Sequence, residues 1–234
     1  YDKAGWRVTR TNVPFMVPTA AELEKLIGEL GIDENSHVVV VPAGVSVLDF
    51  GAAARTYWTL QYVGVKNVSI LDGGVAAWKA ADYPLDTGAH APSPAIFTAT
   101  INKRILAEVS EVEKLQASGK ATLVDARPVS FFLGKVKAPA SLAYGHIPGA
   151  INIDSAEFYD PQTNRLKPKD QLAALAAHVP NGPVVSYCNT GHWASTDWFV
   201  IRELLGHQRA RLYAGSMVEW TSNASRPIES SRTK

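Results

Sequence analysis

The sequence has little cysteine, little net charge and no long apolar run. Its single cysteine, Cys188, excludes a disulfide within the chain, so thiol chemistry concerns one residue. The 23 basic and 22 acidic residues give a formal charge of +1, which offers no electrostatic case for a nucleic-acid or membrane-surface partner. The longest apolar stretch, residues 172–177, is far shorter than the roughly 20 residues that span a bilayer.

Leaders and ligand motifs are also missing. No basic, then apolar, then small-residue leader opens the sequence, so we expect a cytoplasmic protein, or a periplasmic one if a leader has been removed before Tyr1. No group of histidine, cysteine and acidic residues has the spacing of a zinc site, and no GxxxxGK[ST] loop is present. We therefore predict no metal, no nucleotide and no other cofactor.

What the sequence does contain is a repeat. Gly64, Gly73 and Trp78 recur 142 residues later, as Gly206, Gly215 and Trp220. In each copy an apolar strand (38–41 and 184–187) precedes a loop and an apolar helix. A second strand (68–71 and 210–213), a glycine turn and a short helix that contains the tryptophan follow. We expect both tryptophans to fill the core.

The repeat indicates an α/β fold. Apolar strands that alternate with helices are typical of parallel sheets covered by helices on both faces. A period this long indicates two homologous domains rather than a solenoid. Residues 84–104 contain three prolines and a glycine without a periodic pattern, which suits an exposed linker.

The second copy is longer than the first. Ser110 and Glu113 fit a helix capping box, and strands at 121–127 and 151–153 and a helix at 169–179 are expected after it. The first copy matches only that last helix, with a capping box from Thr19 to Glu22. No strand is expected before residue 19, and we infer that the N-terminal part of the first domain is missing.

Cys188 is the candidate nucleophile. It ends the strand 184–187 and precedes Asn189, Thr190, Gly191, His192 and Trp193, after which we expect a helix near Ala194. A strand–loop–helix junction points backbone N–H groups and the positive end of the helix dipole at the loop centre, which stabilises a thiolate. The alternative is that Cys188 is an ordinary small buried residue.

Four segments together resemble a family. Residues 123–127 (LVDAR), residues 145–150 (GHIPGA), the loop 188–193 and the ending from Gly73 to Trp78 look like a tandem rhodanese-type sulfurtransferase of the thiosulfate and 3-mercaptopyruvate group. The resemblance implies two rhodanese-like domains. Residues 1–88 would form the inactive domain, residues 89–106 the linker, and residues 107–234 the catalytic domain.

The resemblance also implies a reaction. Cys188 would take the outer sulfur of a donor such as thiosulfate or 3-mercaptopyruvate as a persulfide, and a thiol or cyanide acceptor would remove it. The loop residues Asn189 to Trp193 would bind the donor. The first copy agrees with inactivity, because residues 41–46 occupy the loop position and contain no thiol.

Departures from the family leave the donor open. Members that use thiosulfate carry basic residues where this sequence has Phe131 and Thr190. Members that use 3-mercaptopyruvate rely on a loop hydroxyl with a histidine and an aspartate. Thr190 could supply the hydroxyl, but no histidine or aspartate here matches the other two roles.

A cysteine in such a loop also occurs in other classes of protein. A phosphatase of the Cys-x5-Arg type would need an arginine at Ala194, so its phosphate clamp is absent. A thiol redox sensor or a non-catalytic rhodanese-fold binding module remains as the alternative to a sulfurtransferase.

The loop 188–193 holds no lysine or arginine. The distal anion of the donor must then contact His192 or an arginine such as Arg7, Arg10 or Arg55. If His192 binds this anion, donor binding should improve as the pH falls through about 6.5 and the histidine becomes cationic.

Two further structural features are expected. Asp125 and Arg127 are expected to form a structural pair. We expect residues 2–15 to form a wall of the pocket.

Overall fold

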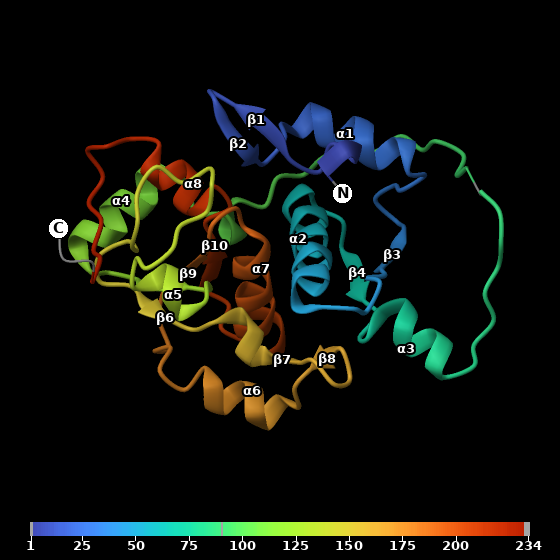
Figure 1. The fold of residues 1–234 in the computed structure, drawn as a ribbon. Helices are drawn as coiled ribbons and strands as arrows, with labels where there is room; N and C mark the ends of the chain where they lie inside the picture. Colours follow the sequence, from blue (N-terminus) through green and yellow to red (C-terminus); the bar gives the residue numbers. More distant parts are fainter. Residues whose placement is uncertain (1, 90, 232–234) are drawn as a thin grey trace.

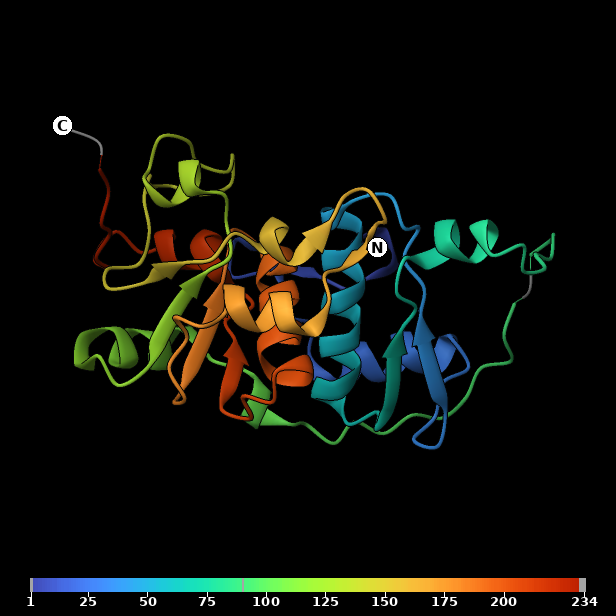
Figure 2. The ribbon, with the colours of Figure 1, turned by 90° about the horizontal axis from the view of Figure 1, so that it is seen from below.

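The computed structural model describes residues 2–89 and 91–231, which form two α/β segments (Figure 1). The first runs to α3 and the second begins at α4, with an irregular stretch between them. Both views place the two segments side by side, with α2 and α7 adjacent (Figures 1 and 2).

A parallel sheet forms the centre of the second segment. In spatial order its strands are β10 (Ala210–Leu212), β9 (Val184–Tyr187), β5 (Thr122–Asp125) and β6 (Ile151–Asn152). Its helices include α4 (Val109–Ser118), α6 (Lys169–Leu175), α7 (His192–Trp198) and α8 (Ser216–Thr221). Val184 belongs to the same apolar cluster as Trp198 of α7, whereas Val185 belongs to a second cluster with Trp220 of α8. Successive side chains of a strand point to opposite faces, so this sheet is covered on both, as expected.

The first segment has a smaller sheet. It consists of the parallel strands β3 (His37–Val40) and β4 (Asn67–Ile70), accompanied by α1 (Ala20–Glu29), α2 (Val47–Val63) and α3 (Gly74–Ala80). Val38 and Val40 pack against apolar side chains of α1 and α2. Val39, which points the other way, is 49% exposed. The prediction that helices cover both faces is therefore wrong for β3, because the second face of this strand is exposed to solvent.

Helices α2 and α7 join the two segments (Figure 2). Tyr57 and Trp58 of α2 belong to the same apolar cluster as Trp198 of α7. The helices approach closely at Gly51, where a Cβ atom would lie only 3.1 Å from the carbonyl oxygen of His192. Beyond Trp198 the chain continues as the π-helical segment η4 (Phe199–Leu204).

Two hairpins and four short helical turns complete the structure. Strands β1 (Val8–Arg10) and β2 (Val13–Met16) are antiparallel, as are β7 (Tyr159–Asp160) and β8 (Arg165–Leu166). The short turns are η1 (Asp2–Ala4), η2 (Lys103–Ile105), α5 (Val129–Phe132) and η3 (Ser155–Phe158). The strands before residue 19 were not expected. Thr11 and Asn12 connect them with φ angles of 46° and 63°, which suit the right-handed twist of a hairpin.

One of the two predicted capping boxes is wrong. The Thr19 hydroxyl accepts from the Glu22 N–H at 3.2 Å, and the Glu22 carboxylate accepts from the Thr19 N–H at 2.6 Å, which confirms the first box. Helix α4 instead begins at Val109, so Ser110 lies inside the helix rather than before it. Glu113 binds Arg226 at 2.6 Å, and this tertiary ion pair replaces the local cap.

The predicted helix at 169–179 ends early, and one of the tryptophans lies outside the core. Helix α6 stops at Leu175, and the chain to Val179 continues as a turn. Trp220 is fully buried, as expected. Trp78 is 37% exposed and instead lies against Tyr83, so it does not fill a core.

Candidate functional site

Cys188 lies at the carboxyl end of β9, between that strand and α7. Its side chain is 1% exposed and packs with Ala194 in the main apolar cluster. Ligand sites of open parallel sheets lie at the carboxyl ends of strands, which is where this sulfur is found.

The loop after Cys188 turns back on the sulfur. The Gly191 N–H points at the Cys188 Sγ at a distance of 3.1 Å. Gly191 has a φ of +91° and immediately precedes α7, so the sulfur also faces the positive end of that helix. A backbone donor and a helix N-terminus both favour a negative charge on the sulfur.

The start of α8 fixes the outer side of the loop. The Met217 N–H donates to the Cys188 carbonyl at 3.0 Å, and the Val218 N–H donates to the Asn189 carbonyl at 3.1 Å. The Cys188 N–H donates to the Ser216 hydroxyl at 3.0 Å, and that hydroxyl donates to the Tyr213 carbonyl. These bonds hold the carbonyl groups away from the sulfur.

Ser216 was not found by sequence reasoning. It is fully buried and has a φ of +53°, a conformation that non-glycine residues rarely adopt. Gly74, 142 residues earlier, has a φ of +57°. The signal in the sequence was therefore a serine at the repeat position where the first copy has glycine. Backbone strain of this kind is concentrated at functional sites.

Asp125 and Arg127 form the expected structural pair. The Arg127 guanidinium donates to both carboxylate oxygens of Asp125, at 2.8 and 2.5 Å, and both side chains are buried. It also donates to the Asn189 side-chain oxygen at 3.4 Å. The Asn189 side chain is therefore fixed by Arg127, which follows the C-terminal end of β5.

The remaining loop side chains lie at the rim. Trp193 packs edge-on against Phe131, with ring centres 6.0 Å apart, and both rings are partly buried. Thr190 accepts from Arg7, whose Nη1 lies 3.2 Å from the threonine Oγ1 and 3.4 Å from its carbonyl oxygen. His192 is the first residue of α7 and is partly buried.

The first segment supplies two arginines to this loop. Arg7, just before β1, contacts Thr190, so part of the segment 2–15 does lie at the loop, as expected. Arg55 of α2 is fully buried, and a Cβ atom on Gly191 would collide with its Nη1. Arg10 does not take part, because it binds Glu22 at 3.1 Å.

Asp197 is a buried acid near the site. It lies on α7, and none of the described residues hydrogen-bonds its carboxyl oxygens. Burial, together with the negative charge of a Cys188 thiolate, raises the pKa of this carboxyl well above its ordinary value. The shift favours the uncharged acid beside the sulfur.

The loop of the first copy keeps the same frame but holds a carboxylate. Val75 and Ala76 donate to the carbonyls of Pro42 and Ala43, as Met217 and Val218 do in the second copy. The Asp49 carboxylate then accepts from the N–H groups of Ala43, Gly44 and Val45, at 3.1, 2.7 and 3.4 Å. Pro42 therefore occupies the place of Cys188, and an acid of the chain fills the anion site.

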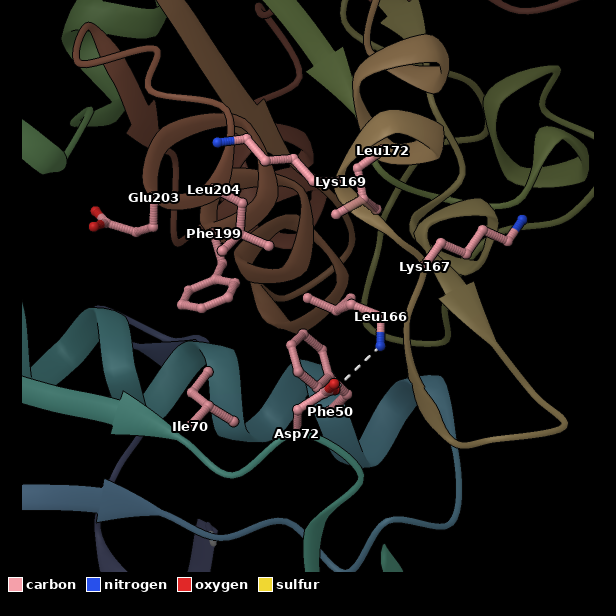
Figure 3. A pocket seen from close by; sticks show the side chains of 10 residues that line it. All are labelled: Phe50, Ile70, Asp72, Leu166, Lys167, Lys169, Leu172, Phe199, Glu203 and Leu204. Atoms are coloured by element: carbon pink, nitrogen blue, oxygen red, sulfur yellow. Dashed lines mark hydrogen bonds between the residues drawn. The ribbon is translucent and has the colours of Figure 1, made fainter.

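A cavity of about 430 Å³ lies between the segments, and none of its lining residues belongs to the Cys188 loop. Figure 3 shows Phe50, Leu166 and Phe199 around it, with the Leu166 N–H donating to Asp72 at 3.3 Å. The nearby lysines, Lys167 and Lys169, direct their amino groups away from these apolar side chains. We assign it no part in the chemistry of Cys188.

Residues 2–89 and 91–231 contain no group of three histidine, cysteine or acidic side chains that could hold a metal ion. Within the same residues no helix is both long enough and apolar enough to cross a bilayer.

Comparison with known proteins identifies relatives. The family model of the rhodanese-like domain matches residues 8–81 and 108–223. A protein of Escherichia coli K12 named 3-mercaptopyruvate sulfurtransferase is 30% identical over 93% of this chain and 76% of its own length. A protein of Synechococcus elongatus named putative thiosulfate sulfurtransferase is 31% identical over 97% of this chain and 72% of its own.

Solved structures agree on the fold. SseA of Escherichia coli, described with the rhodanese fold of 3-mercaptopyruvate sulfotransferases, matches with a TM-score of 0.76 and 29% identity over 89% of this chain and 78% of its own. The anaerobic ergothioneine biosynthesis enzyme of Chlorobium limicola matches with a TM-score of 0.85. Its identity is 21% over 97% of this chain and 59% of its own, so it shows the fold alone. The chain belongs to the rhodanese family, as a tandem-domain sulfurtransferase.

Proposed function

We propose that this chain transfers sulfane sulfur through a persulfide on Cys188. The observation that carries the proposal is the 3.1 Å contact between the Gly191 N–H and the Cys188 Sγ, in front of the N-terminus of α7. A donor and a helix dipole aimed at the sulfur support the thiolate before transfer and the anionic persulfide after it.

The proposed first half-reaction balances without a cofactor. The Cys188 thiolate attacks the outer sulfur of thiosulfate, a new S–S bond forms on Cys188, and the old S–S bond breaks with its electron pair on sulfite. In the second half-reaction a thiophile such as cyanide or a thiolate attacks the outer sulfur and restores the Cys188 thiolate. With 3-mercaptopyruvate the new S–S bond forms on Cys188 while the carbon–sulfur bond breaks. Its electron pair stays on carbon as the enolate of pyruvate, and protonation of that carbon gives pyruvate.

We propose that Arg7 and His192 contact the distal group of the donor. Arg7 lies at the rim of the loop, 3.2 Å from the Thr190 hydroxyl, and a guanidinium suits either a sulfonate or a carboxylate. Asn189 and Gly191 shape the loop, and Trp193 forms its apolar wall with Phe131. Both donors carry an anionic group, so the choice between them stays open.

The test is the formation of thiocyanate from thiosulfate and cyanide by the purified chain. We expect turnover in the wild type and none in Cys188→Ser. Pyruvate release from 3-mercaptopyruvate in the presence of a thiol tests the second donor. Turnover that persists in Cys188→Ser would overturn the persulfide mechanism.

A thiol redox sensor or a non-catalytic binding module is the second candidate. The burial of Cys188 argues against a sensor, because redox-sensing cysteines are solvent-accessible. A sensor would form a sulfenic acid with peroxide and no thiocyanate with any donor. Running both assays on one preparation separates the classes.

The contribution of His192 to donor binding can be tested by measuring the donor KM at several pH values. We expect the donor KM of the wild type to fall as the pH drops from about 8 to 5, since an ordinary histidine becomes cationic in that window. The donor KM of His192→Ala should change less. Equal values for both proteins at every pH would exclude His192 from donor binding.

The division of the chain and its compartment belong to the same proposal. We propose an inactive domain at residues 1–88, a linker at 89–106 and a catalytic domain at 107–234. A cytoplasmic location suits a chain whose reactive thiol must stay reduced and meet thiol acceptors. Fractionation of cells that express the natural gene tests the location.

A further inference from the structure

We infer that Arg55 is a positioning residue, by which the first segment places a buried positive charge against the Cys188 loop of the second. The inference rests on the proposed function, because the charge serves the sulfur anion. It begins from one contact: the backbone of Gly191 leaves no room for a Cβ atom because Nη1 of Arg55 occupies that space. Gly191 is also the residue whose N–H points at the Cys188 sulfur.

The packing of α2 fixes the Arg55 side chain. Arg55 is fully buried, and its guanidinium carbon lies 5.3 Å from the centre of the Trp58 ring. Trp58 is itself buried and donates to the Ile105 carbonyl at 3.1 Å. Close contact between Gly51 and the His192 carbonyl holds α2 against α7. The guanidinium therefore cannot leave the loop without unpacking the two helices.

Other charged groups near Cys188 do not take over this role. Arg127 lies close to the cysteine, but both oxygens of Asp125 accept from it, which offsets its charge. Arg7 lies at the rim, on Thr190. Burial and the cysteine charge raise the pKa of the Asp197 carboxyl well above its usual range, which favours its uncharged form. His192 carries a charge only when it is protonated.

The inference gives the first copy a function. Its own loop holds a proline in place of the cysteine and the Asp49 carboxylate in the anion site. Its helix α2, however, presents a guanidinium to the working loop. A fixed positive charge against the loop favours the anionic form of a sulfur held by that loop. The two copies therefore form one site rather than a working domain with an idle neighbour.

The test compares neutral and charged replacements of Arg55 in the full chain. The readout is the rate of alkylation of Cys188 by iodoacetamide between pH 5 and about 10, which requires a thiolate but no sulfur donor. We expect Arg55→Met to move the midpoint of this profile upward by about one pH unit or more. Arg55→Lys should restore part of the shift. The rate of sulfur loading from thiosulfate at neutral pH should fall at least about tenfold in Arg55→Met.

Two matched controls separate charge from packing. Tyr57→Phe removes a hydrogen bond from α2 to Glu203 of the second segment, 3.4 Å long, but keeps Arg55 and its charge. Arg165→Met removes an arginine that lies against Gly73, the glycine turn of the first copy. Both should keep the wild-type midpoint. Should Arg55→Met fail to fold by circular dichroism, Arg55→Gln takes its place and must show the same shift.

The outcomes distinguish the inference from the proposed function. An unchanged midpoint in a folded Arg55→Met or Arg55→Gln variant would overturn the inference, as would an equal shift in Tyr57→Phe. A wild type that is alkylated normally but takes no sulfur from any donor would instead overturn the proposed function. A midpoint that moves with Arg55 alone supports the inference.

Discussion

Gly191 combines two requirements that only glycine meets. Its φ of +91° disfavours any side chain, and the space where a Cβ atom would stand is bounded by Arg55 and by the Ala214 carbonyl oxygen, 2.8 Å away. The same residue directs its N–H at the cysteine sulfur. Gly191 therefore shapes the loop, contacts the first segment and hydrogen-bonds the sulfur.

We predict that Gly191→Ala lowers the rate of sulfur loading by about 100-fold, because a displacement of about 1 Å at the reacting group has an effect of that size. The free energy of unfolding should fall by about 1–3 kcal/mol. Intact-mass kinetics and thermal melting measure the two effects. Gly119→Ala is the matched control: its φ is +63°, but no atom lies within 4 Å of the added Cβ. A loading rate as low in the control as in Gly191→Ala would show that strain alone, not the loop contacts, causes the loss.

The raised pKa of Asp197 predicts that the free energy of unfolding depends on pH. Its pKa is raised in the folded chain by burial and by the cysteine charge, whereas in the unfolded chain it should lie near about 3.9. Between these two pKa values the folded state binds more protons than the unfolded state. The contribution of Asp197 to stability is therefore present below about pH 3.9 and is lost as the pH rises toward the folded pKa.

We expect Asp197→Asn to remove this loss. The melting temperature of the variant, relative to that of the wild type, should rise as the pH increases from about 4 to 8, since asparagine cannot ionise. Thermal melts of both proteins across that range measure the difference. A constant difference at every pH would mean that Asp197 ionises as freely in the folded chain as in the unfolded one.

For single residues, the sequence was sufficient to predict that Cys188 and its loop form the site, because a cysteine between a buried strand and a helix can be recognised locally. It was not sufficient for Ser216, whose role depends on a positive φ and on bonds to a loop 28 residues away. Arg55 could be named as one of several arginines. Only the packing of α2 on α7 distinguishes it from Arg10.

Among the elements, the hairpin β1–β2 joins the first segment to the loop rim. Arg7, which directly precedes β1, contacts Thr190 and also lies over the ring of Phe15, at 4.6 Å from its centre. Met16 of β2 and Gly215, which precedes α8, line a common pocket. The hairpin therefore lies on the second segment, although it belongs to the first.

We predict that Arg7→Met raises the donor KM by about tenfold or more, because a charge-assisted bond to the donor is worth about 1.5–3 kcal/mol. Arg10→Met is the control from three residues further along the chain, since Arg10 binds the exposed Glu22 rather than the loop. Steady-state kinetics with thiosulfate and cyanide give both values. Equal KM values for the two variants would remove Arg7 from the donor site.

The strands were predicted better than the helix ends. The predicted strand 184–187 coincides with β9, because its apolar run is bounded by Pro183 and the loop. The capping box at Ser110 failed because Glu111 and Glu113 bind Arg211 and Arg226, both at 2.6 Å. Such ion pairs join residues about a hundred positions apart, and no local pattern contains them.

At the scale of the whole molecule, the internal repeat accounts for the architecture. The same bonds from the helix after the second strand hold both loops, and the copies differ in what fills the loop: a thiol in one and the Asp49 carboxylate in the other. The repeat could be read from the sequence. The facing of the copies through α2 and α7 was expected only in outline, since helix packing depends on side chains distant in the chain.

The central claim is that one sulfur atom is carried on Cys188. Intact-mass spectrometry of the full chain, after incubation with thiosulfate and then separately with 3-mercaptopyruvate, tests it most directly. With at least one donor we expect the wild type to gain the mass of a single sulfur atom and to lose it again on addition of cyanide, while Cys188→Ser gains none. A wild type that gains no sulfur from either donor, or a Cys188→Ser variant that still gains one, would contradict the account.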